Sequence, residues 1–230
     1  MAQRGLVISA KDLGAFAYSD PCPRCLWIQL HVKKLPYQTF PGIFSSIDRY
    51  NKLVVNRYFL REGKPPTWLA SLGDIAENVE PPHYTRFSIV HEETGVTLRG
   101  EADGVFRMRD GSYAIVDYKT AKYTPGQEKM LPQYHAQLNG YAFIGDRIGM
   151  GPVTKLLTTG ESAEHPTAVD ELGFRLNLSA TVIDVQLRPD AMIPPLLEQA
   201  RKLFEMSTCP EGKEGCDNCR DLAGLVASLG

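Results

Sequence analysis

Two aspartates and a lysine in the middle of the chain are residue types that bind a divalent cation and activate water. Asp103 ends the segment 98–103, and Asp117 and Lys119 lie in the apolar segment after the next turn. Carboxylate oxygens are preferred ligands of Mg²⁺ and Mn²⁺, and a lysine beside them can orient or activate the attacking water. Side chains alternate along a strand, so Asp117 and Lys119 share one face. Alone, an Asp-x-Lys triplet usually marks only a solvent-facing pair on an edge strand.

The position of Asp103 relative to the other two residues depends on the turn that joins their strands. Residues directly opposite one another in antiparallel strands share a face. An odd-length turn or a bulge sets Asp103 opposite Asp117 or Lys119 and brings all three together. A symmetric two-residue turn at Asp110–Gly111 would instead point Asp103 away from them.

A glutamine and a tyrosine follow on a helix predicted over 132–144. Gln137 and Tyr141 are four residues apart and therefore lie on the same helical face. Gly100 precedes Asp103 by three residues, which gives the order Gly-x-x-Asp, Asp-x-Lys and Gln-x-x-x-Tyr between residues 100 and 141. This ordered set resembles the RecB-like branch of the PD-(D/E)XK nucleases, which carries the three motifs on a strand, a second strand and a helix.

The resemblance implies a metal-dependent nuclease with a core like that of restriction endonucleases. It implies Asp103 and Asp117 as metal ligands together with the main-chain carbonyl of Tyr118, and Mg²⁺ or Mn²⁺ as the cation. It assigns Lys119 to the attacking water and the phosphate. The catalytic residues that it implies, the last two near the active site or the DNA backbone, are Asp103, Asp117, Lys119, Gln137 and Tyr141.

One element of the RecB-like pattern is missing. That branch carries a histidine ligand on a helix before the first strand, and the helix predicted over 43–61 contains no histidine. Asp48 is the best-placed substitute as a metal ligand, because an aspartate can bind the same cation. His83 and His91 lie too close to the first strand, or within it. The same helix carries a basic group that marks either a solvated face or a phosphate-binding one: Arg49, Lys52, Arg57 and Arg61.

Five cysteines are divided between the two ends of the chain, as two Cys-x-x-Cys pairs and a single Cys209. Two such pairs can bind zinc or an iron–sulfur cluster through four thiolates. CRISPR-associated RecB-like nucleases, and the nuclease module of AddB-type helicase–nucleases, hold an iron–sulfur cluster between one early cysteine and three late ones. The resemblance therefore favours a [4Fe-4S] cluster over Zn²⁺. Two ligand sets stay open: Cys22, Cys209, Cys216 and Cys219, which follows those relatives, or Cys22, Cys25, Cys216 and Cys219, which follows the geometry of the pairs.

The remaining pattern predicts a mixed α/β fold, with a mixed central sheet flanked by helices and the two ends of the chain joined at the cysteine metal site. Helices are predicted near 9–18, 26–34, 43–61, 132–144 and 192–206, the last with Pro194-Pro195 in its first turn. Strands are predicted at 84–90, 96–108, 113–118, 154–159 and within 174–187, with a loop at 35–42. We expect one nuclease domain over 1–230, in which 84–145 carries the catalytic core and 20–30 with 205–222 forms the cysteine module.

Composition limits the other classes of protein. Hydrophobic residues make up 43% and charged residues 23% of the chain, as in a protein with a buried core. No run approaches the roughly 18 apolar residues of a membrane span, and no signal peptide is recognisable, so we expect a cytoplasmic protein without a membrane partner. The formal charge of −2 does not favour nucleic-acid binding, which commonly uses a basic surface.

The leading hypothesis is a DNA exonuclease that prefers single strands or ends and works with protein partners in CRISPR or recombination and repair machinery. The alternative is a nucleic-acid-binding or scaffold protein that keeps the nuclease fold and the cysteine site but has lost catalysis. The missing histidine and the acidic balance favour that alternative. A zinc-stabilised interaction module would explain the cysteines but would leave the order of the other motifs to chance.

Overall fold

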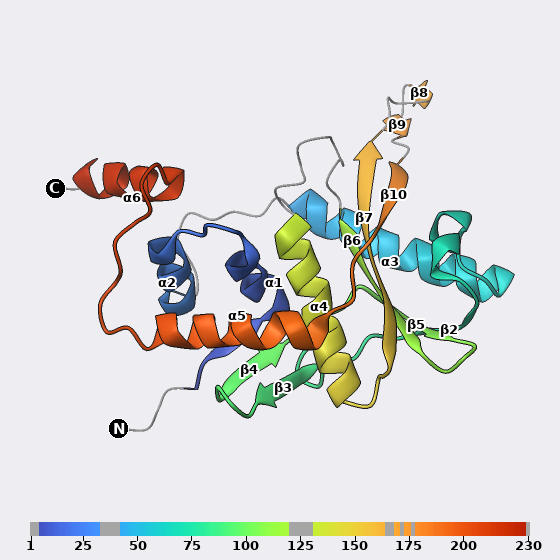
Figure 1. Ribbon diagram of the computed structural model, residues 1–230. Helices are drawn as coiled ribbons and strands as arrows, with labels where there is room; N and C mark the ends of the chain where they lie inside the picture. The colour runs from blue at the N-terminus through green and yellow to red at the C-terminus, as the bar shows by residue number, and fades with distance from the viewer. Residues whose placement is uncertain are drawn as a thin grey trace.

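A five-stranded mixed sheet forms the centre of the fold (Figure 1). The computed structural model describes residues 5–32, 42–119, 131–163, 168–170, 173–175 and 178–228. In spatial order the strands are β10 (Leu178–Asp184), β7 (Val153–Ala163), β6 (Tyr113–Lys119), β5 (Gly104–Met108) and β2 (Ile75–Val79). Strands β6 and β7 are parallel and the other neighbours are antiparallel. This confirms the predicted mixed α/β fold with a central sheet flanked by helices.

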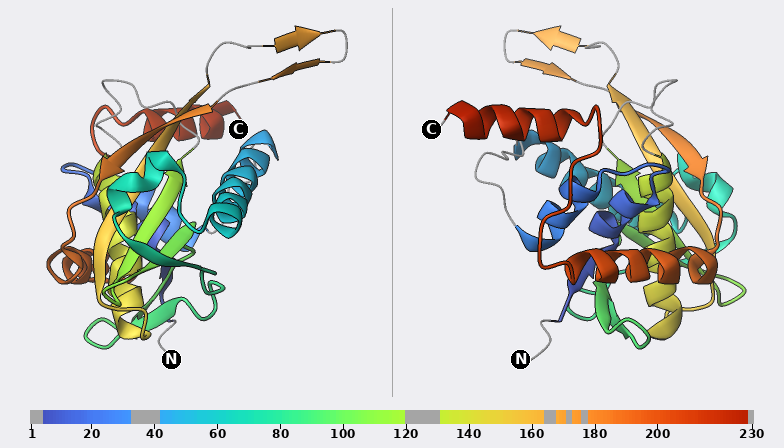
Figure 2. Two further views of the ribbon diagram at one scale, coloured as in Figure 1. Left: turned by 90° about the vertical axis from the view of Figure 1, so that its right-hand side faces the viewer. Right: turned by 60° about the vertical axis from the view of Figure 1, so that its left-hand side comes forward.

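Helices cover both faces of this sheet (Figure 2). On one face lie α4 (Leu131–Arg147) and α5 (Pro189–Phe204), and on the other lie α3 (Gly42–Glu62) and the 3-10 helix η2 (Thr67–Leu72). Strand β6 serves both faces, since Val116 and Tyr118 pack in the cluster formed with α3 and η2, whereas Ile115 packs in the cluster formed with α4 and α5. Because side chains alternate, Asp117 and Lys119 face α4.

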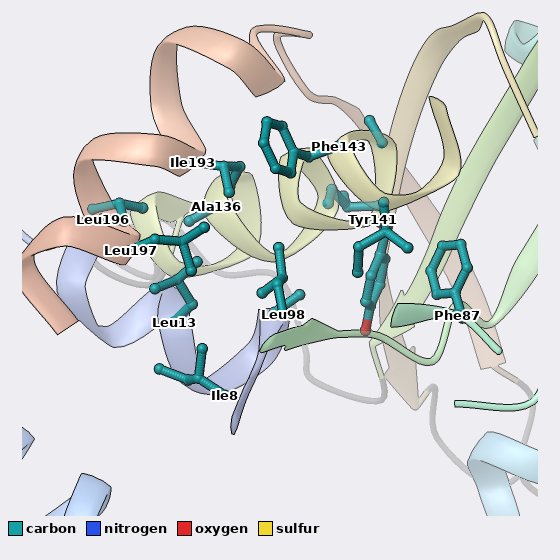
Figure 3. Packing of buried hydrophobic residues seen from close by; sticks show 14 of the residues in the cluster. Ile8, Leu13, Phe87, Leu98, Ala136, Tyr141, Phe143, Ile193, Leu196 and Leu197 are labelled. Carbon is teal, nitrogen blue, oxygen red and sulfur yellow. The ribbon is translucent and has the colours of Figure 1, made fainter. Parts of the chain in front are cut away.

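A smaller three-stranded sheet lies beside α4. Its order is β1 (Val7–Ser9), β4 (Val96–Arg99) and β3 (Ser88–His91), with β1 parallel to β4. The chain continues from β1 into the short helices α1 (Ala10–Leu13) and η1 (Gly14–Ala17) and then into α2 (Pro23–His31). Figure 3 shows the apolar core between this sheet, α4 and α5, where Leu13, Leu98 and Leu197 are fully buried.

The prediction of one strand over 96–108 is wrong. The segment is divided into β4 and β5, which belong to different sheets, with residues 100–103 between them. Strand β4 pairs with β1 and β3, whereas β5 pairs with β2 and β6. The change of sheet coincides with Gly100, whose backbone passes so close to Tyr141 that an added Cβ would lie 2.7 Å from the tyrosine ring. Sequence alternation does not reveal a change of partner strands, so the break had no local signal.

Most other predicted elements agree with the structure. Ser9 caps α1, and its hydroxyl accepts a hydrogen bond from the Asp12 N–H at 3.0 Å. The helices predicted at 43–61 and 132–144 are α3 and α4, and the strands predicted at 113–118 and 154–159 are β6 and β7. The predicted strand at 84–90 is shorter and begins at Ser88. Strands β1 and β2 were not predicted. The loop predicted at 35–42 and the end of the helix predicted at 26–34 lie outside the described residues, apart from Gly42, which begins α3.

The placement of Pro194 and Pro195 in a first helical turn is also wrong. Helix α5 begins earlier, at Pro189, so both prolines lie inside the helix, where each removes a backbone hydrogen bond. The carbonyls released belong to Asp190 and Ala191, which are both exposed, so water can satisfy them.

The last helix, α6 (Asp217–Ser228), lies apart from the sheet and near α2 (Figures 1 and 2). It has no buried residue. Strands β8 (Ala168–Asp170) and β9 (Gly173–Arg175) form a separate antiparallel pair. Among the described helices, none has the length and apolar character needed to cross a membrane.

Candidate active site and cysteine cluster

The turn between β5 and β6 has the geometry needed to bring the carboxylates together. The register pairs Gly104 with Val116, so the turn is centred on Asp110. Extended by one residue beyond Gly104, the same register sets Asp103 against Asp117. The odd-length turn that the cluster requires is therefore present, and it brings Asp103 next to the end of β6, where Asp117 faces α4.

A hydrogen-bond network joins Asp117 to α4. Gln137 donates from Nε2 to Asp117 Oδ1 at 3.0 Å and lies 2.7 Å from the Tyr141 hydroxyl. Lys119 donates to Gln137 Oε1 at 3.1 Å, and its ammonium is 2.5 Å from Asp117 Oδ2. Asp117, Gln137 and Tyr141 are buried, whereas Lys119 is part-exposed. The helix pair predicted by spacing therefore meets the strand pair predicted by alternation.

Asp103 is held between the sheet and α3. Its Oδ2 accepts a hydrogen bond from the backbone N–H of Tyr118 at 2.9 Å, and its Oδ1 lies 2.8 Å from the Lys52 ammonium. Lys52 is also 3.2 Å from Asp48, one helical turn earlier. The structure thus places Asp48 in the lining of the same cavity, with Lys52 between it and Asp103.

One cavity of about 680 Å³ contains these groups. Its volume lies within the roughly 300–1,000 Å³ typical of ligand sites. The residues that line it are Ser9, Ala10, Lys11, Ser45, Asp48, Lys52, Tyr84, Arg99, Gly100, Glu101, Asp103, Asp117, Tyr118, Lys119, Gln137 and Tyr141. His83 and His91 are not among them, but His83 lines a second pocket that also contains Lys52 and Asp103.

Burial controls the charge states of the cavity. Desolvation raises the pKa of Asp117 to about 6, although the Lys119 ammonium acts in the opposite direction. Burial also raises the pKa of Asp103, against the lowering effect of Lys52. For Lys52, burial lowers the pKa, but Asp103 and Asp48 outweigh it, so the net shift is upward and the side chain stays charged. Carboxylates with raised pKa values in a cavity are typical of functional sites.

The carboxylate pair fits a divalent cation. Asp117 Oδ2 is buried and, within the described part of the chain, has an ion pair but no well-directed hydrogen bond. A buried carboxylate oxygen left in this state is costly and fits a ligand that the protein does not itself supply. Asp103 and Asp117, with the main-chain carbonyl of Tyr118, are the oxygen donors that hard cations prefer.

The glycine of the Gly-x-x-Asp motif has a packing role. The ring of Tyr141 lies against Gly100, beside Phe87 at 5.9 Å between ring centroids (Figure 3). Any larger side chain at Gly100 would displace the tyrosine, and with it the hydroxyl that contacts Gln137. This close approach explains why the motif requires a glycine.

Sequence reasoning missed several residues at the cavity. The sequence placed Lys52 in a basic group that is either a solvated or a phosphate-binding face. Its four-residue spacing from Asp48 was the signal that the two side chains could pair on the helix. Lys11, Tyr84 and Arg99 line the cavity and are exposed, and the Arg99 guanidinium lies 5.6 Å from the centroid of the Tyr84 ring. These three gave no sequence signal, because they reach the cavity from α1, from the segment before β3 and from the end of β4.

The two Cys-x-x-Cys pairs meet at the other end of the molecule. The sulfurs of Cys22, Cys25, Cys216 and Cys219 all lie within 4.8 Å of one another. The shortest distances are 3.5 Å between Cys22 and Cys219 and 3.6 Å between Cys25 and Cys216. This group could hold a metal ion, and it joins α2 to the C-terminal segment as predicted.

Cys209 lies outside this group. It is exposed, and its sulfur is 3.7 Å from the carbonyl oxygen of Pro210. The ligand set that includes Cys209 therefore does not match the geometry. Cys25, in the first turn of α2, lies beside Cys216 and Cys219 instead. Burial raises the pKa of Cys22, but hydrogen bonds from the backbone N–H groups of Lys213 and Cys25 outweigh it and lower the pKa to about 6. A thiolate at Cys22 suits a metal ligand.

Comparisons with known proteins bear on the family. No curated protein matches the chain. The crystal structure of SSO0001 matches with 13% sequence identity and a TM-score of 0.40, over 91% of this chain and 82% of that one. The sequence model of the PD-(D/E)XK nuclease superfamily matches residues 47–220, which is more than half of the chain and includes the carboxylates, Lys119, Gln137 and Tyr141. The chain belongs to the PD-(D/E)XK nuclease superfamily.

Proposed function

We propose that this protein is a divalent-cation-dependent deoxyribonuclease of the RecB-like branch, which hydrolyses phosphodiester bonds with an activated water. The observation that carries the proposal is the meeting of Asp103, Asp117 and Lys119 with Gln137 and Tyr141 in one cavity. Two motifs that are weak alone form one polar network, and Asp103 of the third lines the same cavity and accepts a hydrogen bond from the Tyr118 N–H, which chance order in the sequence does not explain.

Each residue of the network has a distinct role in this proposal. Asp103, Asp117 and the Tyr118 carbonyl would hold Mg²⁺ or Mn²⁺, which supplies an acidified water and neutralises charge on the phosphate. Lys119 orients the water and the phosphate, while Gln137 fixes the directions of Lys119 and Asp117. Asp48 would reach the same ion only if Lys52 moved from between it and Asp103.

The charge of the cavity accounts for the dependence on a cation. Among the ion pairs of the described residues, the inner carboxylates Asp48, Asp103 and Asp117 meet two ammonium groups, those of Lys52 and Lys119. With its three carboxylates ionised, this inner cluster carries one net negative charge and repels a phosphodiester locally, while Lys11 and Arg99 add positive charge elsewhere along the cavity lining. A bound divalent cation reverses the sign and lets the phosphate approach.

The rim of the cavity favours a single strand or a frayed end as the substrate. Tyr84 is 42% exposed beside the Arg99 guanidinium, so the two offer a surface for an unstacked base and its phosphate. Lys119 also lies 4.9 Å from the ring of Tyr134. Aromatic stacking with basic neighbours is a common way to bind unpaired nucleotides, whose bases are free to stack on a side chain. Exonuclease action on such ends is the mode we propose.

The spacing of the four cysteine sulfurs favours a single tetrahedral ion, with zinc as the first candidate. Zinc–thiolate bonds of about 2.3 Å place tetrahedral sulfurs about 3.8 Å apart, and the shortest sulfur distances here are 3.5–3.7 Å. A [4Fe-4S] cluster binds each cysteine at a different iron and needs wider spacing. Metal analysis and the visible absorption spectrum of protein purified without oxygen distinguish the two, since only the iron–sulfur cluster absorbs in the visible range.

Within this proposal, residues 84–145 form the catalytic core of one domain and the cysteine module ties the two ends. Protein partners in CRISPR or recombination and repair machinery are proposed by analogy with the RecB-like branch alone, which is a weaker warrant than the site.

The test is a cleavage assay on DNA labelled at the 5′ or the 3′ end, single- and double-stranded, with Mg²⁺ or Mn²⁺. Wild type is compared with Asp117→Asn, and Lys64→Met serves as a remote charge control on an exposed residue. We expect cation-dependent release of short products from single strands, loss in the aspartate variant and no change in the control. A folded wild type that binds both labelled DNA and Mn²⁺ without cutting would instead support the binding protein that has lost catalysis.

A further inference from the structure

Lys52 occupies an unusual place for a basic residue of an exposed helix face. Its ammonium lies 2.8 Å from Asp103 Oδ1 and 3.2 Å from Asp48 Oδ2, and its side chain is 34% exposed. It lines the same cavity as Asp117 and Lys119. A cation bound between two carboxylates at these distances resembles, in charge and position, a metal ion bridging two acidic ligands.

A second divalent cation would need Asp48 and Asp103, the two carboxylates that Lys52 already joins. The first ion is placed at Asp117 Oδ2, which lacks a well-directed hydrogen bond, and at the second oxygen of Asp103, which also accepts the Tyr118 N–H. Asp48 and the first oxygen of Asp103 are then the acidic pair left for another ion, and Lys52 lies between them. A third cationic charge beside Lys52 and the first metal ion would be strongly disfavoured at this spacing.

We propose that Lys52 serves as a fixed cation in place of a second divalent ion, so that the catalytic site binds a single Mg²⁺ or Mn²⁺, at Asp103 and Asp117. Asp48 then anchors Lys52 and is not a metal ligand. This inference rests on the proposed nuclease function for the identity of the ions. It also gives a physical reason for the missing histidine, because a site that takes one ion and one lysine does not need that ligand.

Lys52 has a further role in this arrangement. Its four-carbon chain reaches from α3 across to Asp103 at the edge of the sheet, so one ion pair ties the helix to the site. A positive charge that does not dissociate leaves the site partly neutralised before any metal binds. Lys52 is thus a positioning residue for Asp103, and it makes up part of the charge that the phosphate meets.

The test counts Mn²⁺ ions in the protein without DNA, by calorimetric titration and by the electron paramagnetic resonance signal of free Mn²⁺. The double variant Asp103→Asn/Asp117→Asn defines binding elsewhere, including at the cysteines, and is subtracted. We expect one ion per wild-type chain. In Lys52→Met, with Lys64→Met as the matched control, we expect either a second ion or at least tenfold tighter binding of the first, since a competing positive charge is gone.

Asp48→Asn supplies an independent measurement should Lys52→Met fold poorly. Because Asp48 anchors Lys52, its loss should change Mn²⁺ affinity less than about fivefold, whereas loss of a true ligand typically costs far more. Two Mn²⁺ ions in wild type, unchanged affinity and number in Lys52→Met, or tenfold weaker binding in Asp48→Asn would each overturn the proposal. These results are separate from cleavage: a wild type that cuts DNA with two bound ions refutes the role of Lys52 and leaves the nuclease function standing.

Discussion

Burial of Asp117 predicts that its ionised carboxylate destabilises the metal-free protein. Its pKa is raised from 3.8 to about 6, first through burial, with Lys119 only partly compensating. A shift of one pKa unit corresponds to about 1.4 kcal/mol, so the ionised carboxylate costs the folded state about 3 kcal/mol at neutral pH. The protonated form is the one that the fold favours, so this contribution to stability is present below about pH 4. It is lost as the pH rises to about 6.

Asp117→Asn should therefore be more stable than wild type at pH 8 when no divalent cation is added. The gain should be about 1–3 kcal/mol, below the full shift, because the new amide places a donor against the Lys119 ammonium. The amide oxygen can still accept the hydrogen bond from Gln137. At pH 4 the two proteins should have nearly equal stabilities, because wild type then carries a neutral group at this position as well.

Urea denaturation at pH 4, 6 and 8 measures the difference directly. Asp74→Asn is the control, since that carboxylate is 77% exposed and its removal should change the free energy of unfolding by less than about 0.5 kcal/mol. Added Mg²⁺ should stabilise wild type and not Asp117→Asn, because an ion that binds only the folded site raises its stability. An Asp117→Asn protein less stable than wild type at pH 8 without Mg²⁺ would refute the reasoning from burial.

Three further predictions concern the other residues of the two sites. Lys119→Met should lower the cleavage rate by roughly 10²-fold or more while Mn²⁺ binding persists, because the lysine serves the water and not the ion; equal loss of both would contradict this. Cys25→Ser should lose the bound metal while Cys209→Ser keeps it, as metal analysis can show, and the reverse result would restore the other ligand set. Gly100→Ala should destabilise the fold by about 1–3 kcal/mol in denaturant, because its Cβ would meet Tyr141 at 2.7 Å; an unchanged midpoint would mean that the ring can move at no cost.

The parts of the fold that could be predicted from the sequence are those specified by local patterns. The apolar spacing of α3 and α4, the apolar run of β6 and the turn before it each depend on neighbours within a few residues. The alternation placed Asp117 and Lys119 on one face, and helical spacing placed Gln137 with Tyr141. Both pairs could therefore be proposed before their contact across the sheet was known.

The parts that could not be predicted depend on partners distant in the sequence. Strand β1 has three residues and exists because it pairs with β4, some ninety positions later. The division of 96–108 follows from different partner strands on either side of Gly100. Likewise, Asp48 and Lys52 were recognisable as helical neighbours, but the ion pair with Asp103 required the position of α3 against the sheet. The choice of Cys25 over Cys209 also required the contact of α2 with the C-terminal segment.

The fold depends on the carboxylate cavity and on the cysteine cluster in different ways. Helix α5 is held on α4 by its own buried side chains, including Ile193 and Leu197, so the helix that carries Gln137 does not need the cysteine cluster. Helix α6 has no buried residue, and its contacts are with α2, where the cysteines meet. A metal ion held by the cysteines would supply the attachment that packing does not, and we predict that its removal releases the C-terminal segment while the cavity around Asp117 stays formed. In the proposed scheme the buried, ionised carboxylate of Asp117 lowers the stability of the fold in return for cation binding, whereas a metal ion at the cysteines raises it.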